Sequence, residues 1–314
     1  MPLESRLQYS EETNSARQTG KPVVALESTV ITHGLPYPNN VETAVLMEEA
    51  VRQGGAIPAT IGIIRGKIIV GLSPEQMDHL GRQAGQDTVR KCSRRDLPLV
   101  LAQGGDGSTT VAGTMILAHL AGIELFATGG IGGVHRGHPF DVSADLSEMG
   151  RTPVTVVSSG AKSILDLPAT REVLETQGVT VIGYGTDELP AFYARSSGLA
   201  VDQRLDKPQA IAALIRARRA LGLNSATLVT VPVPEADALD GREAEQAIER
   251  ATREAEEAGI HGPASTPWLL RRMVELTDGR SLRANIALLR NNSLVAAQIA
   301  AALANYSTTQ LFNH

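Results

Sequence analysis

The sequence predicts an α/β fold: an α/β/α sandwich with a mainly parallel central sheet and a helical C-terminal extension. Short apolar runs typical of buried strands alternate with helical patterns along most of the chain. This order is typical of a parallel sheet covered by helices on both faces. Downstream of Pro234 the pattern is wholly helical, and no proline- or serine-rich linker divides the chain. We therefore predict a polar N-terminal leader over residues 1–20 and a single α/β domain over residues 21–314.

The individual elements follow from apolar periodicity and boundary signals. A strand over 21–29 is followed by a helix over 39–55, which Asn39 or Asn40 would cap and a glycine pair would end. The run 57–72 suits a two-stranded hairpin, and the next helix begins with a serine cap and a proline at its first helical position. The alternation continues through helix 109–122, strand 123–130, strand 153–159, helix 171–178, strand 179–185, helix 208–222 and strand 226–234. The C-terminal helices are predicted over 243–259, 266–277 and 281–306.

Composition and charge narrow the classes of function. The chain has 29 Lys and Arg against 34 Asp and Glu, and aromatic residues make up only 3 %, which argues against a nucleic-acid binder. The single cysteine, Cys92, can build neither a disulfide framework nor a multi-thiolate metal site, so we expect a reducing compartment. The first residues lack an apolar signal core, and no run is apolar enough to suggest a membrane span. We expect a cytoplasmic protein that binds small molecules, with neither nucleic acid nor membrane as a partner.

A lysine follows one of the predicted strands in the run SSGAKS, residues 158–163. Ligands of parallel sheets bind at the carboxyl ends of the strands, so Lys162 would reach a binding site. It could hold a phosphate as a point charge, or attack an aldehyde to form a Schiff base. Alternatively it only caps or solvates a loop. The spacing does not match a nucleotide-binding P-loop.

Two more candidates follow predicted strands. In TGGIGGVHRG, residues 128–137, backbone N–H groups could converge on a phosphate, with His135 and Arg136 closing over it. The spacing is not the dinucleotide fingerprint, and a tight structural turn is the alternative. Glu27 ends an apolar strand, where burial could raise its pKa into the range for proton transfer. Its alternative is a buried carboxylate satisfied by backbone donors.

Two charged runs complete the candidates. In DVSADL, Asp141 and Asp145 would share one face if the segment is helical, and could offer oxygen ligands to Mg²⁺ or Mn²⁺. A solvated helix face is the alternative. In KCSRRD, Lys91 and two arginines suit a phosphate or a polar heterocycle, or form an ordinary surface run. Cys92 is not expected to be a nucleophile, because no histidine flanks it.

These runs belong to a larger set of motifs that occur in one order: ALESTVITHGLPYPNN, PATIGIIRGKIIVGLS, KCSRRDLP, TTVAGTM, FATGGIGGVHRG, DVSADL, SSGAKSILDL, IGYGTDELPAFY, STPWLL and NIALLRNN. Together they resemble the pseudouridine-5'-phosphate glycosidase family, also known as the indigoidine synthase A family, from about Lys21 to Ala302. The resemblance implies an enzyme that reversibly cleaves the C–C glycosidic bond of pseudouridine 5'-phosphate to give uracil and ribose 5-phosphate. It also implies an α/β/α catalytic domain, a homotrimer and a divalent metal, usually manganese.

The resemblance assigns roles to residues that match its motifs. Lys162 would be the covalent nucleophile, Glu27 the proton donor and Asp141 the metal ligand. Residues expected at the substrate or at metal-bound water are Lys91, Thr110, Val111, His135, Ser143, Ala144, Asp145 and Asn285. One departure is that the link between the HRG motif and the Phe-Asp pair is shorter here than is usual in the family.

The implied chemistry fits these residue types. A C–C glycosidic bond has no oxygen or nitrogen leaving group to protonate, so hydrolysis by two carboxylates is ill suited to it. A lysine bonded to C1' of a ring-opened ribose offers another path for the electrons, with a carboxyl moving the protons. Two alternatives stay open. One is a Schiff-base aldolase that acts on another sugar phosphate, and the other is a non-catalytic phosphosugar-binding relative.

Overall fold

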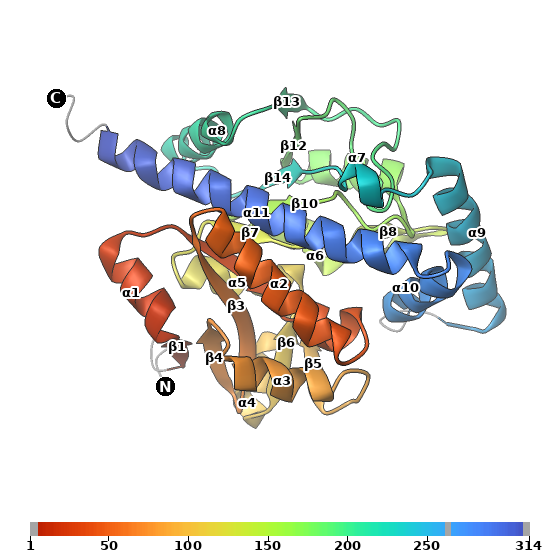
Figure 1. The fold of residues 1–314 in the computed structure, drawn as a ribbon, viewed down its shortest axis with the longest axis horizontal. Coiled ribbons are helices and arrows are strands. Elements are labelled where there is room, and N and C mark those ends of the chain that lie inside the picture. The colour runs from red at the N-terminus through yellow and green to blue at the C-terminus, as the bar shows by residue number, and fades with distance from the viewer. Residues whose placement is uncertain (1–5, 261–264, 310–314) are drawn as a thin grey trace.

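Within residues 6–260 and 265–309, which the computed structural model describes, eleven strands form one mainly parallel sheet (Figure 1). Its main path in spatial order is β1 (Leu7–Tyr9), β4 (Lys67–Val70), β3 (Ile57–Ile64), β2 (Val23–Glu27), β7 (Leu125–Ala127), β10 (Thr155–Ser158), β14 (Thr227–Thr230), β12 (Thr180–Tyr184) and β13 (Gln203–Leu205). β6 (Asp106–Thr109) joins β3 on one side and β5 (Val89–Cys92) on the other. Among the described strands of this sheet, only the pairings of β3 with β4 and with β6 are antiparallel.

A second, small antiparallel sheet lies beside the main one. Its three strands, within the described residues, are β11 (Leu165–Asp166), β8 (Val134–His135) and β9 (His138–Val142), in that order. All residues of β9 are exposed, so this sheet has one solvent-facing edge. The small sheet pairs the segment after β10 with the segment after β7, and thereby brings two of the predicted motifs together.

Helices cover both faces of the main sheet, which confirms the predicted α/β/α architecture (Figure 1). The strands are accordingly apolar on both faces, as in β2, where Val24, Ala25 and Leu26 are fully buried. The helices are α1 (Glu11–Thr19), the π-helix η2 (Val30–Gly34), α2 (Asn39–Gln53), α3 (Pro74–Arg82), α4 (Leu97–Gln103), α5 (Val111–Leu120), α6 (Ala144–Met149), α7 (Leu167–Thr176), α8 (Pro208–Ala220), the 3₁₀ turn η3 (Glu235–Asp237), α9 (Gly241–Glu257), α10 (Ser265–Leu276) and α11 (Arg280–Thr309).

The long helix α11 runs across one face of the sheet beside α2, where it also contacts α8, β7 and β10 (Figure 1). By length and composition alone, Arg280–Asn305 is apolar enough to cross a membrane, although 56 % of its most apolar window is buried inside the fold. Packing against the sheet accounts for this apolar character. The predicted helical C-terminal extension is therefore part of the core.

Two local expectations differ from the structure. Residues 7–19, expected in a polar leader, form β1 and α1, and β1 pairs with β4 at the end of the main sheet. The expected cap of α2 is wrong as well. Pro38 occupies the N-cap, and the side chain of Asn40 is buried, donating to the backbone oxygens of Ile31 and Gly81. The predicted hairpin and the Ser73 cap of α3 are confirmed, the latter as a complete capping box.

Candidate active site

A cavity of about 700 Å³ opens where β2, β7 and β10 reach their carboxyl ends. These three strands are parallel neighbours, so the segments that follow them meet at one edge of the sheet. The residues to which the family resemblance assigns a role all line this cavity: Glu27, Lys91, Thr110, Val111, His135, Asp141, Ser143, Ala144, Asp145, Lys162 and Asn285. The expectation that Arg136 closes over a phosphate beside His135 is wrong, because its guanidinium points into a different cavity and contacts Ser163, Leu165 and Glu245. The topology thus brings together motifs that are far apart in the sequence.

Glu27 is the last residue of β2, and only 7 % of it is exposed. The hydroxyls of Thr29 and Thr128 each donate a hydrogen bond to one oxygen of its carboxylate. Burial raises the pKa of Glu27 above its ordinary value, and the positive charge of Lys162 and the two hydroxyls offset this only in part. A carboxyl in this state keeps its proton to a higher pH and can donate it to a substrate.

Lys162 lies on the segment 159–163, here called the lysine loop, and the segment 128–133 is called the glycine loop. Backbone hydrogen bonds join the two: Lys162 N donates to Ile131 O over 3.1 Å, and Ile131 N donates to Gly160 O over 3.0 Å. Gly160 has a φ of 80°, and a Cβ there would lie 2.6 Å from the carbonyl oxygen of Pro190. Glycine is therefore required at this turn of the lysine loop.

Asn292 of α11 anchors both loops from beneath the site. Its side chain is fully buried and donates to the carbonyl oxygen of Thr128 over 2.9 Å. The same amide nitrogen lies 3.2 Å from the hydroxyl oxygen of Ser159. Asn292 lies in the NIALLRNN motif, but its role could not be predicted, because one asparagine in a helix does not indicate which distant groups it contacts.

The expectation that Asp141 and Asp145 share a helix face is wrong. Ser143 adopts an extended conformation and caps α6, so the helix begins only after it and Asp141 remains in β9. The buried carboxylate of Asp145 accepts hydrogen bonds from the backbone N–H groups of Ala112 and Gly132, each over 2.9 Å. Asp145 therefore joins the start of α5 to the glycine loop.

Asp141 is the predicted metal ligand, and its side chain is half exposed at the cavity. One carboxylate oxygen lies 3.4 Å from Nδ1 of His135. Among the described residues, no group of three or more His, Cys, Asp or Glu side chains is placed to hold a metal ion. The donor set therefore suits a hard divalent cation that keeps water or substrate oxygens as most of its ligands, as Mg²⁺ commonly does in phosphate sites.

Lys91 and His33 bring further polar groups to the cavity. Burial lowers the pKa of Lys91, and the nearby charge of Lys162 adds to this effect. His33, which the sequence analysis did not select, lies in η2 with Nδ1 2.6 Å from the hydroxyl oxygen of Thr32. Burial and the charge of Lys91 lower the pKa of His33 to about 4, so its ring is neutral near pH 7. A neutral imidazole at this position can form a hydrogen bond with a bound ligand.

The other members of the KCSRRD motif differ in their surroundings. Arg94 lines the cavity but forms a two-pronged ion pair with buried Glu148, with N–O distances of 2.6 and 2.7 Å. The side chain of Arg95 is 84 % exposed. Lys91 is thus the most enclosed of the three predicted cations. Cys92 is fully buried, and burial raises the pKa of its thiol to about 12, in agreement with the expectation that it is not a nucleophile.

Comparison with known proteins places this chain among proteins of closely similar length and fold. A pseudouridine-5'-phosphate glycosidase from Paracoccus denitrificans is 56 % identical, with 94 % of this chain and 97 % of the relative aligned. One from Hahella chejuensis is 52 % identical, with 95 % of this chain and 99 % of the relative aligned.

Two solved structures share the fold. The prealnumycin C-glycosynthase AlnA, solved in complex with ribulose 5-phosphate, has a TM-score of 0.88 and 41 % sequence identity, covering 96 % of this chain and 98 % of its own. An indigoidine synthase A-like protein from Thermotoga maritima has a TM-score of 0.86 and 38 % identity, covering 95 % and 96 %. Residues 12–302 of this chain match the family described as indigoidine synthase A like protein. The chain belongs to the indigoidine synthase A-like family.

Proposed function

We propose that this protein reversibly cleaves the C–C glycosidic bond of pseudouridine 5'-phosphate to uracil and ribose 5-phosphate. The relatives named above carry that activity in their names. The observation that carries the proposal is the placement of Lys162 and Glu27 at one cavity, close enough that the charge of Lys162 lowers the pKa of Glu27 against the effect of burial. An amine nucleophile beside a proton-donating carboxyl is the pair that a Schiff-base route requires.

In the cleavage direction, the C1'–O4' bond of the ribose breaks and Glu27 gives its proton to O4'. The Lys162 amine bonds to C1', and the proton that it loses returns to Glu27. The nitrogen lone pair then forms a C=N bond to C1' while the C1'–C5 bond breaks, leaving its electron pair on uracil, where C5 takes the proton from Glu27. Water hydrolyses the protonated C=N bond, which releases ribose 5-phosphate, and the amine returns its extra proton to Glu27. The net reaction consumes one water.

The substrate phosphate has a function in this route because ring opening leaves a flexible chain. A charged group held far from C1' limits the motion of that chain and supplies binding energy at the reacting carbon. Lys91 is the enclosed cation available for this contact, and the backbone N–H groups of the glycine loop are further donors. The N–H of Gly132 already donates to the carboxylate of Asp145, so it is not one of the donors available to the phosphate.

A divalent cation, manganese or a similar ion, is part of the proposal, with Asp141 as its protein ligand and His135 beside it. When bound, the ion would neutralise phosphate charge and order water near the substrate. Titration calorimetry with Mn²⁺ is expected to show binding to the native protein that Asp141→Asn weakens. Equal binding by the two proteins would remove Asp141 from this role.

A second candidate is Schiff-base chemistry between a sugar phosphate and a different carbon partner. The observation that favours it is that AlnA, at 41 % identity, is a C-glycosynthase solved with ribulose 5-phosphate. Release of free uracil from pseudouridine 5'-phosphate separates the two candidates. Release by the native protein and none by Lys162→Ala supports the glycosidase, whereas ribose 5-phosphate bonded to Lys162 without uracil turnover supports the second candidate. A protein that binds ribose 5-phosphate but shows neither reaction would be a phosphosugar-binding relative.

A further inference from the structure

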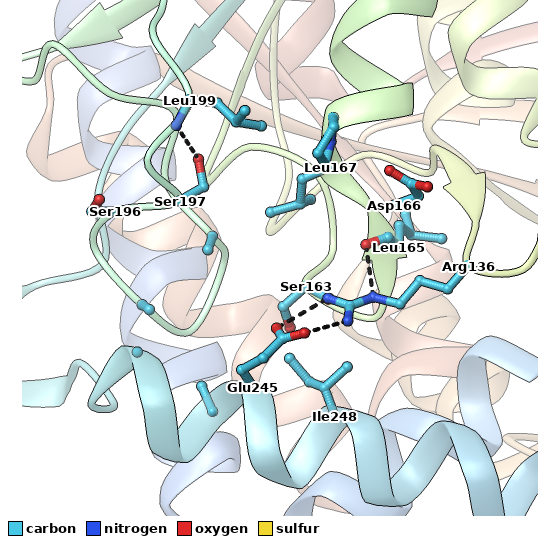
Figure 2. Close-up of a pocket in the computed structure, with 15 residues that line it drawn as sticks. Arg136, Ser163, Leu165, Asp166, Leu167, Ser196, Ser197, Leu199, Glu245 and Ile248 are labelled. Atoms are coloured by element: carbon cyan, nitrogen blue, oxygen red, sulfur yellow. Dashed lines mark hydrogen bonds and ion pairs between the residues drawn. The ribbon is translucent and has the colours of Figure 1, made fainter.

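A second cavity of about 480 Å³ lies beyond the lysine loop, lined by residues of that loop, of α9 and of the segment 191–199 (Figure 2). Leu165 borders both this cavity and the candidate active site. Ser163, the residue directly after Lys162, lines the second cavity. The backbone that carries Lys162 therefore forms part of the wall between the two spaces.

The guanidinium group of Arg136, the residue after β8, donates hydrogen bonds to the backbone that separates the two cavities (Figure 2). Its Nη2 donates to the carbonyl oxygen of Ser163 over 3.0 Å, and its Nε donates to that of Leu165 over 3.1 Å. Two further N–H groups contact the carboxylate of Glu245 on α9, with N–O distances of 2.5 and 3.1 Å. The guanidinium group is planar and has five N–H donors, so it can donate to two carbonyl oxygens and one carboxylate at the same time.

The lysine loop accepts one further backbone hydrogen bond from the segment 191–199, from Phe192 N to Ser159 O over 3.2 Å, but that bond lies before Lys162, whereas Arg136 contacts the residues after it. The hydroxyl oxygen of Ser163 is buried without a hydrogen-bond partner among the described residues, so its side chain does not anchor the backbone. β11 contributes only the short pairing of Leu165 with His135 and of Asp166 with Val134. Toward the glycine loop, the bond from Lys162 N to Ile131 O holds the segment from the opposite direction.

We propose that Arg136 and Glu245 form a latch that fixes the position of the Lys162 amine in the candidate active site. Arg136 acts as a positioning residue through the backbone of the lysine loop, and Glu245 fixes the orientation of the guanidinium from α9. The proposal rests on the proposed function, in which Lys162 must lie within bonding reach of C1'. A displacement of about 1 Å at a reacting group lowers rates by up to about a hundredfold.

The latch is tested by the rate at which ribose 5-phosphate becomes bonded to Lys162. The protein is mixed with ribose 5-phosphate, samples are reduced with borohydride at successive times, and the adduct on the Lys162 peptide is measured by mass spectrometry. Partial unfolding of a variant lowers the final amount of adduct, whereas a misplaced amine lowers the rate. The rate is therefore the readout that a merely structural role does not move.

Three variants define the expected result. Arg136→Met is expected to slow adduct formation about tenfold to a hundredfold, with half-saturation by ribose 5-phosphate unchanged. Arg136→Lys is expected not to restore the rate, because one ammonium cannot serve two carbonyls and Glu245 together. Glu245→Gln is expected to slow the reaction less, and to have no further effect when Arg136→Met is present.

Glu243→Gln is the matched control, since Glu243 lies on the same helix and forms a similar two-pronged ion pair with Arg280 of α11. It is expected to keep the native rate within about twofold, as for an exposed ion pair away from the site. A native rate in Arg136→Met or full rescue by Arg136→Lys would overturn the latch. Absence of any adduct in the native protein would instead overturn the proposed function.

Discussion

At the scale of single residues, burial determines the chemistry of Glu27. Its carboxyl is almost enclosed and its pKa is raised, although Lys162 and two hydroxyls lie near it. Glu27→Gln keeps the shape and the acceptor oxygen but cannot carry a proton. We expect it to slow uracil release about a hundredfold to ten-thousandfold, the usual contribution of a positioned acid or base. Steady-state assays that monitor uracil check this, and a rate within threefold of native would show that Glu27 is not the proton donor.

His33 gives a prediction for acid stability. Its pKa is about 4 in the folded protein, below the ordinary value of 6.5, so the unfolded chain binds more protons between these two values. The stabilisation that neutral His33 contributes is therefore complete above pH 6.5 and is lost as the pH falls toward 4. Relative to His33→Gln, the native protein should lose stability across this window. Urea unfolding at pH 7 and pH 4.5 measures the difference, and an unchanged gap between the proteins would contradict it.

At the scale of elements, comparing Gly160 in the lysine loop with Gly178 tests whether the backbone conformation of that loop positions Lys162. Gly160 and Gly178 both have positive φ values, but a Cβ would clash with Pro190 only at Gly160 and would meet nothing within 4 Å at Gly178. Gly178→Ala should cost about 1 kcal/mol through its backbone conformation alone and leave adduct formation unchanged. Gly160→Ala should cost more and slow adduct formation, because the carbonyl of Pro190 must move. Thermal unfolding and borohydride trapping report the two effects, and identical behaviour of the variants would contradict this account.

The elements that could be predicted from sequence are those with local signals. The Ser73 capping box and the hairpin between β3 and β4 depend on residues a few positions apart. β1 was missed because Leu7–Tyr9 becomes a strand only by pairing with β4, some sixty residues away. Asn40 looked like a helix cap, but its side chain is used to join η2 and α3 to α2.

The same distinction holds for the candidate site. Lys162 and Glu27 were identifiable because Glu27 ends an apolar strand and Lys162 follows one, and parallel strands place such residues at one edge. Asn292 contacts Thr128 across 164 positions of sequence, and Arg136 contacts Glu245 across 109. No local pattern indicates such pairings. His33 was not predicted because its neutral state depends on burial in the folded chain and on the charge of Lys91, which is distant in the sequence.

At the scale of the whole molecule, α11 belongs to the core and also contacts the candidate active site. It packs across the sheet beside α2, and Asn292 on it anchors both loops of the site (Figure 1). The family resemblance also implies a homotrimer, which we retain as a proposal. Size-exclusion chromatography with light scattering should give three times the mass of the chain, and a monomer at micromolar concentration would contradict it.

The synthetic reaction shows directly whether Lys162 forms and breaks the C–C bond. Purified protein with Mn²⁺ is incubated with ribose 5-phosphate and uracil, and pseudouridine 5'-phosphate is followed by chromatography and mass, with Lys162→Ala in parallel. We expect product from the native protein and none from the variant, since the C–C bond forms at the carbon bonded to Lys162. Product from Lys162→Ala at the native rate, or no product from a native protein that still forms the ribose 5-phosphate adduct, would contradict it.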